Sequence, residues 1–335
     1  MKNKVVTFGE VMLRFNPEGF MRISQVQKFE ATLAGSESNA AVTLANLGVD
    51  VSYVTKVPDH DVGNIVFTEM RRFGVDTSDI IRGGNRLGIF YLEKGASQRP
   101  SKVIYDRAGS SFALSHSDEY DWDKILNNAT WFHFSAITPA LSDELATACL
   151  VAAKKAKSLG ITVSCDINYR SQLWSKEKAG KVMATIMPYV DICINPDIFG
   201  IDFDYSKGMP AEEEYYEIAK KHADLFGFKK VAFSLRESFS ADRNIYSSMI
   251  YDRIEDKATF SKKYDMHIVD RVGGGDCFAG GLIYSYLNEF SDKDAIEFAT
   301  AASCLKHSVE HDFAMSSAEE VYALMNGDAT GRIKR

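Results

Sequence analysis

The stretch of sequence that decides the fold is MHIVDRVGGGDCFAGGLIYSY, residues 266–286. It predicts a strand, a tight turn at the three glycines of residues 273–275, and a helix of small and apolar residues over about 276–287. Consecutive glycines let the backbone turn sharply and point several N–H groups in one direction, and the N-terminus of the following helix adds positive potential. Such a turn attracts anions, above all phosphate.

Asp276 is an unexpected residue in a simple anion site, because its carboxylate would repel phosphate. It fits a site in which the carboxylate faces a hydroxyl group that attacks the phosphate. The backbone of Gly273, Gly274 and Gly275 would then stabilise the charge that develops on the transferred group. The alternative is purely structural, since aspartate is a common helix N-cap and glycine turns join strands to helices in many proteins.

The whole unit resembles the signature of the ribokinase-like (PfkB) carbohydrate kinases. In that signature an aspartate, two residues, three small residues and a second aspartate precede a helix of small residues. Arg271 departs from it, because the family usually has a small residue, proline or valine there. The matching positions are Asp270, Gly273, Gly274, Gly275, Asp276, Gly280 and Gly281.

The resemblance runs from Gly9 to Val321 and therefore covers nearly the full length. It implies a single α/β domain over residues 1–335. The expected architecture is a central, mostly parallel sheet with helices on both faces, and a small β-sheet lid built from two separate segments, 12–34 and 86–107. A lid suits the chemistry, because water must be kept from an activated phosphoryl group. Its sheet edges favour pairing, so we expect a homodimer through the lid sheet.

Composition agrees with a globular enzyme. The chain has 335 residues, 45% of them hydrophobic and 25% charged, which is enough to bury a large core. The net charge of −7 argues against nucleic-acid binding, and no run approaches the ~20 apolar residues that span a membrane. Five widely spaced cysteines without a CxxC pair, and a first strand at residues 4–10 without an apolar signal segment, predict reduced thiols and a cytoplasmic location.

From residue 130 onward, predicted strands and helices alternate, which indicates a parallel sheet with covering helices. Ligands of such sheets bind at the carboxyl ends of the strands. Four strand ends carry polar residues suited to binding, and these are residues 135–139, 166–170, 195–197 and 234–237. The expected strands are 130–135, 161–166, 190–195 and 230–235, and the expected helices are 141–159, 176–187 and 211–225.

The segment AGSESNAA, residues 34–41, predicts the start of a helix after a run of small residues. It resembles the N-terminal sugar-binding motif of the same kinases, although Pro58 and Gly63 replace the usual glycine spacing. The resemblance implies that the backbone of Gly35 lies close to the sugar and that Asn39 hydrogen-bonds in the site. The alternative is a capped amphipathic helix in which Asn39 is merely polar.

Two arginines indicate the class of sugar. Arg170 lies in DINYRSQLW, residues 166–174, which closely resembles a segment of the 2-keto-3-deoxygluconate kinases, and Arg107 lies in a YDR segment that resembles them too. A guanidinium group matches a carboxylate with two parallel hydrogen bonds, whereas a neutral hexose has no use for it. An acid sugar is therefore favoured, with two surface arginines as the alternative.

The same resemblance implies further substrate contacts. Tyr91 or Tyr105 would assist the arginines, and Ile137 lies in a segment, residues 135–142, that is also similar to those enzymes. Asp312 matches a second substrate-contacting aspartate of the subgroup. Its usual glycine neighbour is replaced by His311, which affects the expected backbone shape.

The nucleotide side departs more from the family. Asn195 matches the start of an Asn-x-x-Glu segment whose last position here is the apolar Ile198, and Asp197 could substitute through water. Arg236 replaces the glycine of the family's Thr-Leu-Gly-Glu segment, and we favour a phosphate contact over a surface ion pair for it. The expected nucleotide-binding residues are Asn168, Asn195, Ser234, Arg236, Gly273 and Gly275.

The resemblance implies ATP-dependent phosphorylation of the terminal hydroxyl of 2-keto-3-deoxygluconate, with Mg²⁺ held mostly by water and with K⁺ as a further candidate cofactor. No protein-held metal site is predicted, and a Walker-type kinase is excluded because GxxxxGK[ST] does not occur. A fructokinase or ribokinase acting on a neutral sugar stays open, as does a catalytically silent sugar-binding regulator. A dinucleotide oxidoreductase would need a glycine fingerprint that the first strand lacks.

Overall fold

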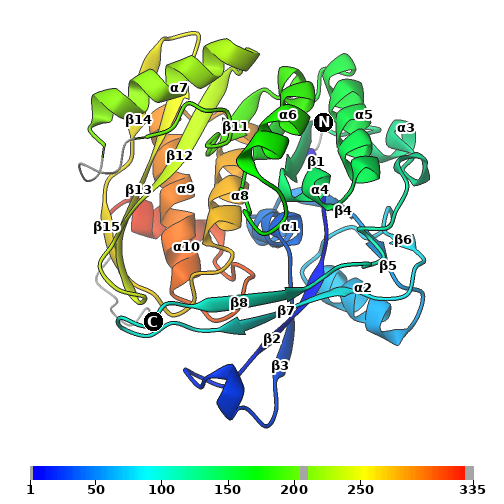
Figure 1. Ribbon diagram of the computed structural model, residues 1–335. Coiled ribbons are helices and arrows are strands. Elements are labelled where there is room, and N and C mark those ends of the chain that lie inside the picture. Colours follow the sequence, from blue (N-terminus) through cyan, green and yellow to red (C-terminus); the bar gives the residue numbers. More distant parts are fainter. Residues whose placement is uncertain (1–2, 204–209, 329–335) are drawn as a thin grey trace.

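A nine-stranded central sheet organises the computed structural model, which describes residues 3–203 and 210–328 (Figure 1). Along one edge-to-edge path the strands follow the order β14-β13-β12-β11-β10-β9-β1-β4, and β15 pairs with β13 beside β14. The strands are β1 (Lys4–Phe8), β4 (Asp50–Val54), β9 (Trp131–Ser135), β10 (Thr162–Asp166), β11 (Ile192–Ile194), β12 (Lys230–Ser238), β13 (Arg243–Asp252), β14 (Lys257–Phe260) and β15 (Tyr264–His267).

The six strands from β4 to β12 run parallel, and β13, β14 and β15 add antiparallel pairings at one side. The parallel strands are short runs of buried residues, as a sheet that is covered on both faces requires. The predicted fold class, a mostly parallel sheet flanked by helices, is confirmed.

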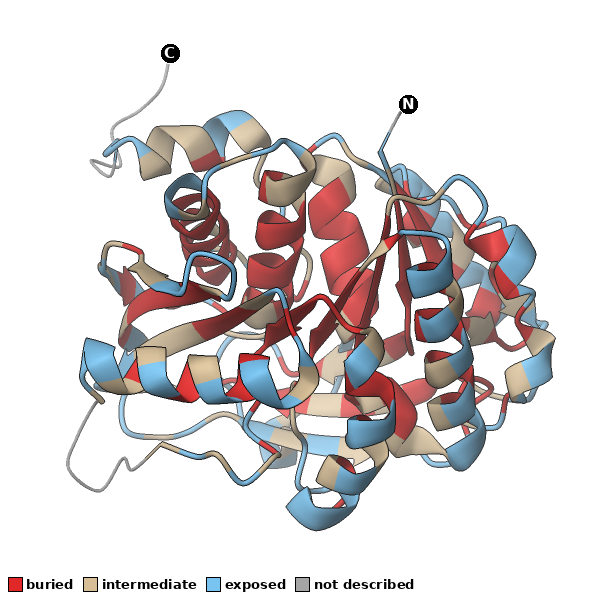
Figure 2. Ribbon diagram, turned by 90° about the horizontal axis from the view of Figure 1, so that it is seen from above, coloured by how far each residue is buried: buried red, intermediate tan, exposed pale blue. Residues whose placement is uncertain are grey.

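Helices cover both faces of this sheet, and each face has its own hydrophobic cluster. Figure 2 shows buried residues concentrated in the central strands and on the helices packed against them. The first face carries α3 (Trp122–Ile125), α5 (Asp143–Ser158), α6 (Lys176–Ile186) and α7 (Glu212–Phe226). The second carries α1 (Ser36–Asn46), α2 (Asp61–Arg72), α8 (Gly274–Leu287) and α9 (Asp292–His307), and the remaining helices are α4 (Ile137–Leu141) and α10 (Ala318–Met325).

A second, small sheet stands apart from the central one (Figure 1). Its strands lie within the two segments that the sequence predicted, and their order is β3-β2-β7-β8. The central pair, β2 and β7, is parallel, and the outer pairs are antiparallel. These strands are β2 (Met12–Asn16), β3 (Glu30–Ala34), β7 (Gly88–Glu93) and β8 (Lys102–Asp106), and a separate pair is β5 (Lys56–Val57) with β6 (Ile81–Arg82).

Helix α8 lies between α1 and α9, and its small residues allow both contacts. A Cβ atom on Gly280 would lie 2.8 Å from the Thr43 side chain of α1. One on Gly281 would lie 3.0 Å from the Ala299 Cα of α9. Larger residues would push the helices apart, because packed interiors leave no space of that size.

Two predicted helices differ from the structure by more than one residue at a boundary or by an interruption. Helix α8 begins at Gly274 rather than Asp276, because Gly273 caps it in a left-handed conformation with φ 81°. The single helix expected over 141–159 is interrupted at Ser142, which has extended backbone and accepts a hydrogen bond from Leu145 N at 3.2 Å. Serine favours such an N-cap position over the middle of a helix. Within the two described ranges, no helix is long and apolar enough to span a bilayer.

Candidate active site

A cleft of about 370 Å³ separates the small sheet from the carboxyl ends of the central strands. The small sheet contributes Met12, Phe90, Val103 and Tyr105, and the opposite wall contains the glycine turn and Asp276. A second cavity, of about 510 Å³, shares Asn168, Arg170, Asn195 and Ser234 with the first. The two cavities together have room for two ligands that meet near these shared residues.

Asp276 lies in the first turn of α8 and is 9% exposed. One of its carboxylate oxygens accepts a hydrogen bond from Asn39 Nδ2 at 2.7 Å, and the other accepts one from Ser36 Oγ at 2.7 Å. Asn168 Nδ2 in turn donates to Ser36 Oγ at 3.1 Å. Burial raises the pKa of Asp276, and the two hydrogen bonds oppose that rise. The carboxylate is thus held in one orientation at the cleft wall and is more basic than an exposed aspartate.

The glycine turn depends on glycine at residue 273. Its φ of 81° lies in the left-handed region, and a Cβ atom there would be 2.1 Å from the Asp312 carbonyl oxygen. Gly273 and Gly275 both line the cleft, next to Asp276. The first N–H groups of a helix have no acceptor within the helix, so this turn offers donors to an anion in the cleft.

Arg14, on β2 of the small sheet, is fully buried and holds two acidic residues of the opposite wall. Its Nη1 donates to Asp312 Oδ2 at 2.5 Å and its Nη2 to Asp270 Oδ2 at 2.5 Å. Burial raises the pKa of Asp312 to about 6, with the Arg14 charge opposing that shift. One guanidinium group therefore ties the small sheet to the residue that begins the glycine-turn motif and to a residue of the cleft.

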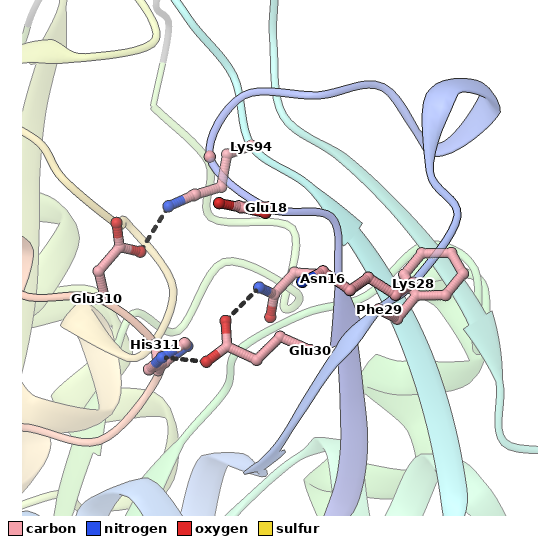
Figure 3. Close-up of a pocket in the computed structure, with 9 residues that line it drawn as sticks. Asn16, Glu18, Lys28, Phe29, Glu30, Lys94, Glu310 and His311 are labelled. Carbon is pink, nitrogen blue, oxygen red and sulfur yellow. Dashed lines mark hydrogen bonds and ion pairs between the residues drawn. The ribbon is translucent and has the colours of Figure 1, made fainter.

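The residues before Asp312 also pair with the small-sheet region. Glu310 accepts from Lys94 Nζ at 2.5 Å, and His311 Nε2 lies 3.3 Å from Glu30 Oε1. Figure 3 shows these pairs around a side cavity of about 570 Å³. His311 has φ 66°, in the left-handed region that glycine adopts freely and that other residues seldom adopt.

Arg107 and Arg170 line the same cleft, but their surroundings differ. Arg107 is buried and its Nε donates to Glu10 Oε2 at 2.8 Å; its Nη2 contacts the same oxygen. Arg170 is exposed and has no ion pair with any residue that the structure describes. Burial raises the pKa values of Asp166 and Asp276, which line the same cleft, and the charge of Arg170 opposes that rise.

Of the two candidate tyrosines, the structure brings Tyr105 to the cleft and not Tyr91. The Tyr91 ring stacks on Phe15 at 5.8 Å and meets Phe29 edge-on at 5.4 Å. Neighbouring residues of a strand point to opposite faces, so Phe90 occupies the cleft side of β7 and Tyr91 the outer side. Ile137, Gly35 and Asp312, three further candidates for substrate binding, also line the cleft.

The expected nucleotide-binding residues cluster at the ends of β10, β11 and β12. Asn168 and Asn195 have left-handed backbone, with φ 36° and 50°. Asn195 Oδ1 accepts from Ser234 N at 3.0 Å, which joins two strand ends. All three line both cavities, and Arg236 lines the cleft. Ile198 is buried, and Asp197 lines the larger cavity.

Sequence reasoning missed Arg14, Ser36 and Glu37 as functional candidates. Glu37 is 1% exposed, accepts from Ser135 N at 2.7 Å and lines the cleft; burial raises its pKa to about 7. Asp166 is also buried, and burial followed by the charge of Asp276 raises its pKa to about 7. Ser36 and Glu37 lie inside the AGSESNAA motif, whereas no local signal marks Arg14.

Comparisons with known proteins agree with this geometry. The sequence profile described as pfkB family carbohydrate kinase matches residues 2–202 and 246–314. The chain is 30% identical to a 2-dehydro-3-deoxygalactonokinase of Haloferax volcanii over 99% of both chains, and 28% identical to a 2-dehydro-3-deoxygluconokinase of Bacillus subtilis over 91% of this chain and 90% of that one. A crystal structure of 2-dehydro-3-deoxygluconokinase from Thermotoga maritima is 48% identical, with a TM-score of 0.93 over 97% of this chain and 100% of that one.

Proposed function

The chain belongs to the pfkB family of carbohydrate kinases, and we propose that it transfers the γ-phosphoryl group of ATP to the terminal hydroxyl of 2-keto-3-deoxygluconate. The observation that carries this proposal is Arg170, an unpaired guanidinium group within the described residues that shares a cleft with Asp276 and the glycine turn. A sugar carboxylate would neutralise it. The relative from Haloferax leaves the galactonate epimer as a related substrate.

In the proposed reaction Asp276 faces the terminal hydroxyl of the sugar. The hydroxyl oxygen forms a bond to the γ-phosphorus while the bond to the bridging oxygen of ADP breaks, and the hydroxyl proton moves to Asp276 late in the step. Ser36 and Asn39 hold the carboxylate through their 2.7 Å hydrogen bonds, so it needs no reorientation. The backbone N–H groups of the turn at 273–276 stabilise the charge on the transferred group.

The sugar would lie between the small sheet and the N-terminus of α1. Arg170 would bind the carboxylate as a bidentate partner. Arg107, whose charge is already shared with Glu10, would hold the sugar through its remaining donors and position Tyr105. The other proposed substrate contacts are Gly35, Asn39, Ile137 and Asp312.

The nucleotide would lie over the strand ends, with Asn168, Asn195, Ser234 and Arg236 as contacts and with Gly273 and Gly275 near the transferred phosphate. Bound Mg²⁺ would neutralise phosphate charge. The oxygen-rich floor fits it, because Asp166 and Asp197 have no ion pair in the part of the chain that the structure describes. In that part, no cluster of three His, Cys, Asp or Glu side chains could hold a metal. A role for K⁺ as a cofactor stays a prediction, and measuring activity with and without K⁺ tests it.

We propose that the small sheet acts as the lid and that its outer face joins two copies of the chain. The strand register aligns Phe15, Tyr91 and Ile104 across β2, β7 and β8 on the face turned away from the cleft. Ile104 is 42% exposed and Phe29, beside Tyr91, is 36% exposed. An apolar row of this kind favours burial in a homodimer. Light scattering of the wild type and of Ile104→Lys tests this, since the proposal expects a dimer that the lysine weakens.

The five cysteines are all buried and free of disulfides, which supports the cytoplasm as the proposed location. The function itself is tested by coupled ADP release over a panel of acid and neutral sugars. We expect turnover with 2-keto-3-deoxygluconate and little with fructose or ribose. Equal turnover with neutral sugars would favour a fructokinase or ribokinase. The absence of ADP release with every sugar of the panel would favour a silent regulator.

Asp276→Asn separates catalysis from binding in the same assay. We expect turnover to fall by about 10²- to 10⁴-fold, because the amide cannot accept the proton, while the affinity for the acid sugar stays near that of the wild type. The asparagine keeps the size of the side chain and can still bond to Ser36. Near-normal turnover of this variant would contradict the assignment of Asp276 as the base.

A further inference from the structure

Two arginines that depart from the family pattern come together in the cleft. Arg236, on β12, stands where the family resemblance expects glycine, and Arg271, two residues before Gly273, stands where it expects a small residue, proline or valine. They are far apart in the sequence, yet both line the same cavity wall as Gly273, Gly275 and Asp276. Neither was predicted to act with the other.

Each side chain is held but not neutralised. Arg271 Nη2 donates to the Ala241 carbonyl oxygen at 2.9 Å, and Arg236 Cζ lies 5.8 Å from the centre of the Tyr246 ring. The Nε of Arg236 is buried without a hydrogen-bond partner, and neither guanidinium forms an ion pair with a carboxylate of residues 3–203 or 210–328. Burial lowers the pKa of Arg271, and the charge of Arg236 is the second cause.

The charges of Arg236 and Arg271 repel one another, and Asp270, which offsets part of the charge of Arg271, is already bonded to Arg14. Lys306 is a third buried cation, and burial lowers the pKa of His307 to about 4, so that this imidazole is neutral. An anionic ligand with more than one charge would reverse the repulsion.

We propose that Arg236 and Arg271 form a clamp on the terminal phosphates of the nucleoside triphosphate, an inference that rests on the proposed kinase function. A guanidinium group binds phosphate oxygens in a bidentate manner. Of the described residues that line the cleft, none is a lysine, and Arg107 is already paired with Glu10. With Arg170 assigned to the sugar, these two arginines are the cations left for the phosphates among the described residues of the cleft. Lys176, in the second cavity, is paired with Asp202.

The positions of Arg236 and Arg271 favour a phosphate over the sugar as their ligand. Arg236 follows Ser234 on β12, and Asn195 accepts a hydrogen bond from that serine at 3.0 Å, so Arg236 belongs to the nucleotide side. Arg271 precedes the turn whose amides face the transferred group. The sugar side, with Tyr105 and Arg107, comes from the small sheet. The clamp would thus hold the β- and γ-phosphates against the glycine turn.

The test compares Arg236→Met, Arg271→Met and the double variant in steady-state kinetics. We expect KM for ATP to rise about 10- to 100-fold, or kcat to fall by that factor, in each single variant, while KM for the acid sugar changes less than about twofold. The kinetic constants of Arg271→Lys should lie between those of the wild type and of Arg271→Met, because lysine keeps the positive charge but cannot bind phosphate in a bidentate manner. Arg243→Met is the matched control: this arginine pairs with Asp265 on exposed surface and should leave both constants unchanged.

A binding measurement without sugar makes the outcome independent of the proposed substrate. Calorimetry with ATP and with inorganic tripolyphosphate should show weaker binding of both by more than about tenfold in the double variant. That result would stand even if no acid sugar supported turnover, in which case the proposed function fails and the clamp does not. A rise in sugar KM with ATP constants unchanged, or unchanged tripolyphosphate binding in a variant that melts like the wild type, would overturn the clamp.

Discussion

Among the described residues, charged side chains are paired on one side of the cleft and unpaired on the other. At the small-sheet junction, defined here as Arg14, Lys94, Arg107, Glu30 and their partners, every guanidinium or ammonium group has a carboxylate, as in Arg14 with Asp270 and Asp312. The cleft floor also holds charges of both signs but forms no ion pairs within the described residues. The floor consists of Glu37, Asp166, Arg170, Arg236, Arg271 and Asp276.

We infer from this difference that the paired residues stabilise the fold and that the unpaired residues bind ligands. A buried ion pair keeps two elements in register, and breaking it leaves an uncompensated charge. Unpaired ionisable groups in a cleft, with shifted pKa values, mark functional positions more often than structural ones. Four predictions follow the contrast, from the largest expected effect to the smallest.

Arg14→Met should cause the largest loss of stability, about 3–5 kcal/mol in the free energy of unfolding, because Asp270 and Asp312 would stay buried without their cation. Urea denaturation monitored by fluorescence measures it. The control is Arg253→Met, whose pair with Asp224 is exposed and should contribute less than about 1 kcal/mol. If Arg14→Met lost no more stability than Arg253→Met, the ion pairs of the small-sheet junction would not stabilise the fold as proposed.

The pH dependence of stability in Glu37→Gln tests whether Glu37, on the cleft floor, is protonated in the folded protein. The folded pKa of Glu37 is raised from 4.5 to about 7, so the stability linked to its bound proton is present below pH 4.5 and is lost as the pH rises through 7. Glutamine cannot lose a proton. Relative to wild type, the variant should therefore gain roughly 2–3 kcal/mol between pH 5 and pH 8.

Denaturation curves at both pH values measure that gain for Glu37→Gln. Glu217→Gln, at an exposed position of α7, provides the matched comparison and should shift by less than about 0.5 kcal/mol. A pH-independent difference between Glu37→Gln and wild type would mean that Glu37 is ionised throughout this range.

Arg170→Ala and Arg107→Ala compare the two walls directly. Arg170→Ala should raise KM for the acid sugar about 10- to 100-fold and leave the melting temperature near that of the wild type. Arg107→Ala should lower the melting temperature as well, because Glu10 is 4% exposed and would lose its partner. The contrast breaks if both variants melt like the wild type, or if sugar KM is unchanged in Arg170→Ala.

His311→Gly should have the smallest effect, within about 1 kcal/mol of the wild-type free energy of unfolding. Glycine relieves the left-handed backbone, while the loss of the pair with Glu30 and the added freedom of the unfolded chain oppose that gain. Comparing the thermal unfolding of His311→Gly with that of His311→Val separates the backbone effect from the loss of the Glu30 pair. Both variants lose the pair, but valine tolerates this backbone conformation poorly. Equal melting temperatures for the two variants would contradict the backbone argument.

Much of the site could be predicted because local patterns carry it. The glycine turn and Asp276 follow from backbone preferences within a dozen residues, and the strand ends at Asn168 and Asn195 follow from alternating strand and helix patterns. The family resemblance offered Tyr91 and Tyr105 as alternatives, and no local pattern decides which face of the small sheet is turned to the cleft. The cleft selects Tyr105, since only the pairing of β7 with its neighbours decides which side of a strand is covered.

The sequence by itself determined the α/β architecture, the anion-binding turn and the residues around it, since each of these is set by conformational preferences of neighbouring residues. Only the tertiary structure decided which charges are paired. Arg14 meets partners that lie 256 and 298 residues away along the chain, and Arg236 and Arg271 share one wall although no pattern links them. An ion pair depends on distance in space, and the chain carries no local signal of that distance.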